Sequence, residues 1–206
     1  GSEMCIRDRP NPVDTDKFRP IKSYHERKRN LGMSVRALKY KYGIDIAIKA
    51  IGGLKDCELI VVGDGPLREY LKDLAKKHTA NVKFVYEGIR HEKLPEYYNE
   101  VGFFVAPSRT EAQGVAMCEA LACGTPVVAT RVGGIPEFVI HRYNGILSSK
   151  PTPAELRKAI ITMINMPIDD YCKLSQNAAN LAKRTFSSEI IIPKELNVHY
   201  KSSEMI

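Results

Sequence analysis

The sequence lacks the features of several specialised protein classes. No apolar run approaches the roughly 20 residues that a bilayer-spanning helix requires, and we find no signal peptide. The five cysteines form no Cys-x-x-Cys pair, and the five histidines are dispersed without the spacing of metal ligands. We therefore expect a cytoplasmic protein with free thiols that requires no metal ion and no bound cofactor.

Positive charge is in excess, but it is concentrated in one part of the chain. The net charge is +7, and residues 1–42 hold 11 Lys and Arg against 5 Asp and Glu. The other 164 residues are almost neutral, with 20 basic and 19 acidic side chains. A nucleic-acid-binding domain more often carries a basic stripe on its folded elements. We therefore expect no nucleic-acid partner and interpret the basic segment as solvated, with attraction to an anionic membrane surface as the minor alternative.

The length and composition fit one well-buried domain with appendages. The chain has 206 residues, of which 44% are hydrophobic and 27% charged. We treat residues 1–9 as a non-native tail and expect a turn-rich, polar segment over 10–30. The central domain is expected over 31–186, followed by a C-terminal tail helix over 187–206.

The clearest local pattern lies between Phe103 and Thr130. It consists of an apolar strand over 103–106, a polar turn, a helix over 113–123 and a second apolar strand over 127–129. Both strands are continuously apolar, which is typical of a parallel sheet covered on both faces. Further strands are expected at 32–38, 58–62, 82–86 and 144–147, with helices at 44–51, 66–77, 91–100, 152–166 and 168–184. This alternation predicts an α/β fold with a Rossmann-like, doubly wound and mostly parallel sheet.

Two carboxylates in this pattern occupy unusual positions. Glu111 precedes the helix and Glu119 lies within it, separated by a rise of roughly 12 Å and an azimuth of roughly 80°. Between them lie the free amides of the helix N-terminus, which attract an anion such as a diphosphate. Because carboxylates repel phosphates, their natural partners are hydroxyl groups on either side. A nucleotide-sugar has this order of groups.

A simpler alternative exists for each carboxylate. Glu111 can serve only as a favourable negative charge at the helix N-terminus, and Glu119 can be solvent-exposed. For Glu111 both interpretations stay open. The neighbours of Glu119 on the helix are all apolar or small, so a charge there needs a partner. Elsewhere, Gly133 and Gly134 allow a close backbone approach to a ligand or to the neighbouring turn, and we favour the structural role.

Several segments together resemble a known family. The Glu-x7-Glu pattern in PSRTEAQGVAMCEALACGTPVVAT (107–130) is similar to the donor-binding signature of the family 4 glycosyltransferases, which are retaining enzymes of the GT-B fold. The resemblance extends to VVGDGPL (61–67), PEYYNEVGFFVAPS (95–108) and VGGIPEFV (132–139), and it runs from Asn11 to about Tyr200. It covers only the C-terminal half of such an enzyme, and residues 10–30 resemble the segment that joins the two halves.

The resemblance implies roles for individual residues. Glu111 would be the catalytic-site contact to the transferred sugar, and Glu119 would bind the ribose hydroxyls. Val35 stands where the family usually has Gly, and Tyr42 is an extra residue, so Lys39 is the alternative to Lys41. The remaining donor-binding residues implied are Arg36 and Lys41 for the diphosphate, Ala112, Gln113, Gly114 and Val115 at the helix N-terminus, and Ile89 and Arg90 beside the base.

The implied function is donor binding in a retaining hexosyltransferase. The substrate would be a nucleotide-diphosphate sugar, bound without a metal, and the acceptor would be a glycan, a lipid or a small molecule. An N-terminal acceptor-binding domain or subunit would be missing from this chain, which alone would transfer nothing. The full enzyme could associate peripherally with a membrane. Two alternatives stay open: a natural donor subunit that pairs with a separate acceptor-binding chain, and a non-catalytic nucleotide-sugar-binding module.

Overall fold

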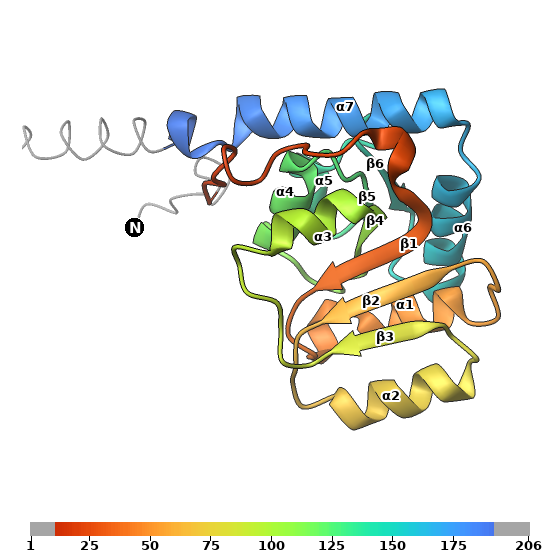
Figure 1. The fold of residues 1–206 in the computed structure, drawn as a ribbon. Coiled ribbons are helices and arrows are strands. Elements are labelled where there is room, and N and C mark those ends of the chain that lie inside the picture. Colours follow the sequence, from red (N-terminus) through yellow and green to blue (C-terminus); the bar gives the residue numbers. More distant parts are fainter. Residues whose placement is uncertain (1–10, 192–206) are drawn as a thin grey trace, which may run out of the picture.

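Six parallel strands form the centre of the molecule (Figure 1). The computed structural model describes residues 11–191. The sheet has the order β3-β2-β1-β4-β5-β6, and every neighbouring pair is parallel. The strands are β1 (Lys28–Val35), β2 (Glu58–Val62), β3 (Val82–Val85), β4 (Val101–Ala106), β5 (Val127–Thr130) and β6 (Gly145–Ser148). This confirms the predicted Rossmann-like α/β fold, with a sheet that is wholly parallel.

Helices cover both faces of this sheet (Figure 1). They are α1 (Ile44–Ile51), α2 (Arg68–Lys77), α3 (Leu94–Glu100), α4 (Val115–Ala122), α5 (Ile135–Phe138), α6 (Pro153–Ile164) and α7 (Ile168–Thr185). Strand β4 shows how two cores arise from one continuous apolar run. Phe104 and Ala106 join the cluster that contains α3 and α4, and Phe103 and Val105 join the cluster under α1 and α6. Side chains therefore alternate between two buried faces, as an apolar parallel strand requires.

The chain reverses its direction across the sheet between β1 and β4. From β1 it proceeds outward to β2 and β3, and then it returns to β4 on the other side of β1. The carboxyl ends of β1 and β4 are therefore neighbours from which the chain departs in opposite directions. In doubly wound sheets this switch point is where ligands bind. It brings Arg36, directly after β1, beside the turn that follows β4.

The two loops at the switch point are tied together by an ion pair. The Arg109 guanidinium donates to both carboxylate oxygens of Asp45 at 2.8 Å. Its Cζ also lies 3.9 Å from the centroid of the Tyr40 ring, in the 3-10 turn Tyr40–Tyr42. Behind this pair, a Cβ atom at Gly43 would lie 1.9 Å from the Pro107 carbonyl oxygen, so the backbones are in direct contact. The loop after β4 is thus held against the loop after β1.

The two glycines of the loop before α5 pack on the turn before α4. The Gly134 amide donates to the Glu111 carbonyl oxygen at 3.0 Å. A Cβ atom at Gly134 would lie 1.8 Å from the Ala112 carbonyl oxygen, and one at Gly133 would lie 2.0 Å from that of Glu111. Gly133 also has a φ of +52°, which favours glycine. The close approach expected here is therefore to the backbone that carries Glu111.

The domain begins earlier in the chain than the boundary expected at residue 31. Strand β1 starts at Lys28, and a short 3-10 helix occupies Tyr24–Glu26. Arg27, only 3% exposed, donates to the Thr125 hydroxyl, the Asn99 side-chain oxygen and the Cys123 carbonyl. The polar sequence around Arg27 gives no indication that its side chain is buried, because the acceptors that satisfy the guanidinium lie 72 to 98 residues away.

The segment before residue 28 is likewise packed on the domain. Val13 and Phe18 are buried, and the Val13 amide donates to the Phe186 carbonyl oxygen at 2.8 Å. Residues 188–191 are helical, whereas most of the predicted tail helix lies outside the described residues, as does the tail over 1–9. None of the described helices is long and apolar enough to cross a membrane.

Replacing Arg27 by alanine should destabilise the fold. The substitution removes the donor to the Thr125 hydroxyl and to the Cys123 carbonyl, which costs about 2–4 kcal/mol of unfolding free energy. Urea titration followed by circular dichroism measures this loss. The matched control is Lys28→Ala, which removes a surface ion pair with Glu100 and should change the midpoint little. Equal midpoints for the two variants would contradict the role given to Arg27.

Replacing Asp45 by asparagine should destabilise the fold in a pH-dependent way. Burial alone would raise the pKa of Asp45, but the hydrogen bonds and charge of Arg109 bring it below its ordinary value. Because the pKa of Asp45 is lower in the folded state, its ionised form stabilises the fold at pH values above the unfolded pKa. This stabilisation is lost as the pH falls through the pKa of the folded state. We expect a loss of about 1–3 kcal/mol at pH 7 that shrinks below about pH 4. The exposed control Asp73→Asn should show no such dependence; a loss for Asp45→Asn that stays constant down to pH 3 would refute the ion-pair account.

Candidate functional site

Arg36, Ser108 and Glu111 form a hydrogen-bonded cluster at the switch point. One guanidinium nitrogen of Arg36 donates to Ser108 Oγ at 2.6 Å and to Glu111 Oε2 at 3.1 Å. Ser108 Oγ lies 3.2 Å from the same carboxylate oxygen and donates to it. The side chains of Arg36 and Glu111 are 6% and 12% exposed. The structure thus brings together two of the predicted site residues and adds Ser108, which the sequence analysis missed.

Arg36 is a buried cation that is only partly satisfied by its neighbours. Burial lowers the pKa of its guanidinium, and the Glu111 carboxylate opposes that shift. Its Cζ lies 5.3 Å from the centroid of the Tyr42 ring. No described residue accepts a hydrogen bond from the buried Nε atom. A buried donor without an acceptor is costly.

Glu111 also lies against the N-terminus of α4. A Cβ atom built on Gly114 would lie 3.5 Å from the Cγ and Cδ atoms of Glu111. Gly114 precedes the helix with a φ of +75°, and its carbonyl accepts from Met117 and Cys118 at 2.9 and 3.1 Å. Within the described chain, the amides of 114–116 have no backbone acceptor. These amides are available to an anion, as predicted for Gly114 and Val115.

Glu119 is buried and paired, so the alternative of a solvent-exposed side chain is wrong. It is 6% exposed, its Oε1 atom lies 2.7 Å from His91 Nε2, and its Oε2 atom accepts from the Tyr98 hydroxyl at 3.3 Å. Burial first, and then the Glu119 charge, raise the pKa of Tyr98 well above its ordinary value. The partner that a charge on an apolar helix requires is therefore present. The sequence contains no signal that identifies His91 as that partner.

The loop between β3 and α3 reaches α4 through His91. Ile89 is half-buried and packs against the core cluster beside α4, and Arg90 is exposed. The Arg90 carbonyl accepts from the Lys93 amide at 2.8 Å, which closes the turn before α3. Because His91 contacts Glu119, the loop that carries Ile89 and Arg90 lies beside α4 at the carboxyl edge of the sheet.

Lys41 lies in the exposed turn after β1, and the Gln113 side chain contacts the segment before β1. Lys41 is exposed, its Nζ lies 4.9 Å from the Tyr42 ring centroid, and it forms no ion pair with a described residue. Lys39 is exposed as well. The Gln113 side chain is buried and bonds the Asn11 backbone twice, accepting at 2.5 Å and donating at 2.9 Å. It therefore anchors the segment before β1 to the turn before α4.

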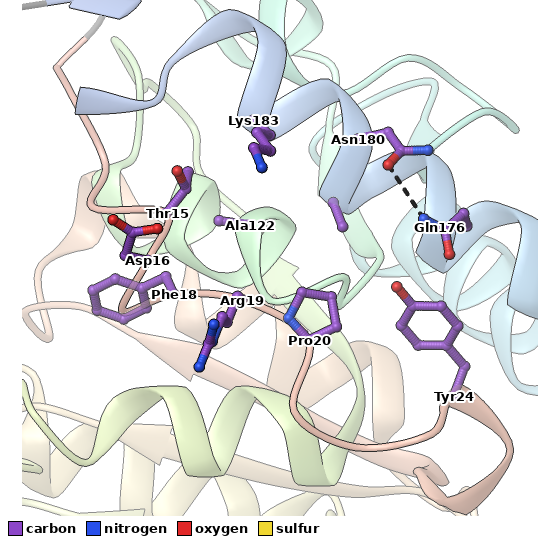
Figure 2. Close-up of a pocket in the computed structure, with 11 residues that line it drawn as sticks. Thr15, Asp16, Phe18, Arg19, Pro20, Tyr24, Ala122, Gln176, Asn180 and Lys183 are labelled. Carbon is purple, nitrogen blue, oxygen red and sulfur yellow. Dashed lines mark hydrogen bonds between the residues drawn. The ribbon is translucent and has the colours of Figure 1, made fainter. Parts of the chain in front are cut away.

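The structure also contains a cavity of about 390 Å³. It is bounded by the segment Thr15–Tyr24, by Ala122 at the end of α4 and by one side of α7, with Asn180 and Lys183 toward it (Figure 2). None of the predicted site residues lines it. Among the described residues, no cluster of His, Cys, Asp and Glu could hold a metal ion.

Comparisons with known proteins identify the family. Residues 16–182 match Glycosyl transferases group 1. An uncharacterized glycosyltransferase of Methanocaldococcus jannaschii is 34% identical over 142 residues, which are 69% of this chain and 40% of that protein. A GDP-mannose-dependent alpha-(1-6)-phosphatidylinositol monomannoside mannosyltransferase of Mycolicibacterium smegmatis is 33% identical over 165 residues, which are 70% of this chain and 43% of that protein. The chain therefore spans less than half the length of these relatives.

Solved structures show the same fold. The sucrose-phosphate synthase of Thermosynechococcus elongatus matches with a TM-score of 0.86 and 24% identity, over 96% of this chain and 52% of that one. The C-terminal domain of a group 1 glycosyl transferase from Francisella tularensis matches with a TM-score of 0.73 and 21% identity, over 85% of this chain and 99% of that one. The fold is that of the GT-B glycosyltransferases, and the chain belongs to the family Glycosyl transferases group 1.

Proposed function

We propose that this chain is the donor-binding half of a retaining, family 4 glycosyltransferase and that it binds a nucleotide-diphosphate hexose. The observation that carries the proposal is the position of the buried Arg36–Glu111 pair, beside the free amides of α4 at the switch point of the sheet. Doubly wound folds bind ligands in this place. The Francisella structure, named as a C-terminal domain, supports the assignment to that half.

The diphosphate would lie between Arg36 and the N-terminus of α4. The amides of Gly114 and Val115 present the positive end of the helix dipole, and Arg36 supplies a full positive charge. As the bond between the sugar and the diphosphate breaks, negative charge grows on the leaving group. Fixed donors at that place stabilise the transition state more than the ground state.

The two carboxylates would bind the groups on either side of the diphosphate. Glu111 Oε2 already accepts from Arg36 and Ser108, whereas no described residue donates to Oε1, which is left for a sugar hydroxyl. Glu119 would accept from the ribose hydroxyls. The loop with Ile89 and Arg90 would border the base, and Lys41 would reach the phosphates from its exposed turn. The exposure of Lys41 lets it move to a ligand, since no ion pair with a described residue holds it.

The acceptor would be bound by protein that this chain does not contain. The chain covers 40 to 43% of the length of the two relatives above. We therefore propose that an N-terminal domain or a separate subunit closes over the carboxyl edge of the sheet. The mycobacterial relative is named for GDP-mannose, and an Anabaena structure of the same fold is described in complex with UDP and glucose, so guanosine and uridine diphosphate sugars are the first donors to test.

Nucleotide-sugar binding should depend on Glu119 and not on exposed carboxylates. A panel of uridine and guanosine diphosphate hexoses is screened by thermal shift, because a ligand at 100 times its Kd adds about 2.7 kcal/mol of stability. For the donor that binds, Glu119→Gln should weaken affinity about 10- to 100-fold, since hydrogen bonds to charged groups contribute about 1.5–3 kcal/mol. Calorimetry measures the Kd of the folded variant.

The matched control is Glu96→Gln, at an exposed position on α3 whose one ion pair among the described residues is with Lys93 at 2.7 Å. It should leave donor affinity unchanged. An undiminished affinity in Glu119→Gln would remove Glu119 from the site, and a wild-type chain that binds no member of the panel would refute the proposed function.

A further inference from the structure

The two oxygens of Glu119 lie in different surroundings. Oε2 faces the hydroxyl of Tyr98, which is fully buried in the core. Oε1 faces His91, whose side chain is 56% exposed. Of the two partners of this carboxylate, His91 is therefore the one that is open to solvent. The position of His91 decides how the accessible oxygen is presented.

The contacts of His91 determine where its proton resides. Nδ1 lies 3.0 Å from the Lys17 ammonium nitrogen, and Nε2 lies 2.7 Å from Glu119 Oε1. An ammonium group can only donate, so Nδ1 must accept. The imidazole is then neutral, with its proton on Nε2, which donates to Glu119. Lys17, His91 and Glu119 thus form a chain of two hydrogen bonds that runs from a cation to a carboxylate.

Lys17, the first residue of this hydrogen-bond chain, lies in a segment that is anchored to the core. Phe18, beside Lys17, is 1% exposed and belongs to the same core cluster as Tyr98. Its ring centroid lies 5.1 Å from that of His91 and 6.2 Å from that of Tyr98. Figure 2 shows Thr15, Asp16, Phe18, Arg19 and Pro20 following one another along the cavity wall below α7. The backbone of the segment that carries Lys17 is therefore fixed by core packing.

We propose that His91, supported by Lys17 and Phe18, is a positioning residue that orients Glu119 for a ribose diol. The inference rests on the proposed function. Tyr98 holds Oε2 and His91 holds Oε1, so the carboxylate has a fixed orientation in which each oxygen keeps one lone-pair site for a ligand. Two adjacent hydroxyls of a ribose need an acceptor fixed in this way. A ligand without the ribose, such as inorganic pyrophosphate, gains no binding free energy from the orientation of Glu119.

The test compares two probes in the same variants. Wild-type chain and His91→Ala are titrated by calorimetry with uridine or guanosine diphosphate, whichever binds more tightly, and with inorganic pyrophosphate. We expect His91→Ala to weaken nucleoside diphosphate binding about 5- to 10-fold and to leave pyrophosphate binding within about twofold. Lys17→Met should weaken nucleoside diphosphate binding by a smaller factor, about two- to fourfold. The matched control His25→Ala changes another exposed histidine and should alter neither affinity.

A double variant separates positioning from a direct contact. If His91 acts through Glu119, then adding His91→Ala to Glu119→Gln should produce little further loss of nucleoside diphosphate binding. Additive losses would show that His91 contacts the ligand by itself and would overturn the positioning role. Equal losses for nucleoside diphosphate and pyrophosphate in His91→Ala would show a general structural effect and would also overturn it.

The proton position on His91 provides a test that needs no ligand. Nitrogen-15 NMR of the imidazole in the wild-type chain should report a protonated Nε2 and an unprotonated Nδ1. A proton on Nδ1 instead of Nε2 would be incompatible with the hydrogen bonds from Lys17 to His91 and from His91 to Glu119, and would overturn the inference. Failure of the wild-type chain to bind any nucleoside diphosphate would instead refute the proposed function, so the two failures are distinguishable.

Discussion

The geometry of the candidate site depends on one buried guanidinium. This group, on Arg36, lies at the point where the strand order of the sheet reverses. Arg36 directly follows β1, next to the end of β4, and its charge is balanced by Glu111, with Ser108 bonded to both side chains. Removing either charged partner would leave the other uncompensated in a poorly hydrated place. The pair therefore fixes the turn before α4, and with it the direction in which the helix presents its free amides.

Two further contacts keep that turn in place from opposite sides. Arg109 binds Asp45 across the loops after β4 and β1, and Gly134 donates to the Glu111 carbonyl from the loop before α5. The Gln113 side chain adds a third connection, to the backbone of Asn11. Because this turn is already ordered, a ligand would not have to order the Glu111 carboxylate when it binds. The entropic cost of binding would then be lower. The rigidity of the site is thus produced by contacts outside it.

The sequence predicted the elements better than the contacts between them. Strand β2 has the predicted bounds, and the burial of Glu119 with a partner followed from its apolar helical neighbours. The burial of Arg27 could not be predicted, because its acceptors lie 72 to 98 residues away and include a backbone carbonyl. The Arg109–Asp45 and His91–Glu119 pairs join residues 64 and 28 positions apart. A single sequence shows periodicity and local turn chemistry, whereas such pairs arise only when the sheet order is known.

Diphosphate binding by the N-terminus of α4 together with Arg36 can be measured without a nucleotide. Nitrogen-15-labelled chain is titrated with inorganic pyrophosphate and followed by amide NMR. We expect the largest shifts at the amides of Gly114, Val115 and Ala116, and loss of those shifts in Arg36→Met. Shifts confined to the cavity between Thr15–Tyr24 and α7, or an unchanged response in Arg36→Met, would contradict it.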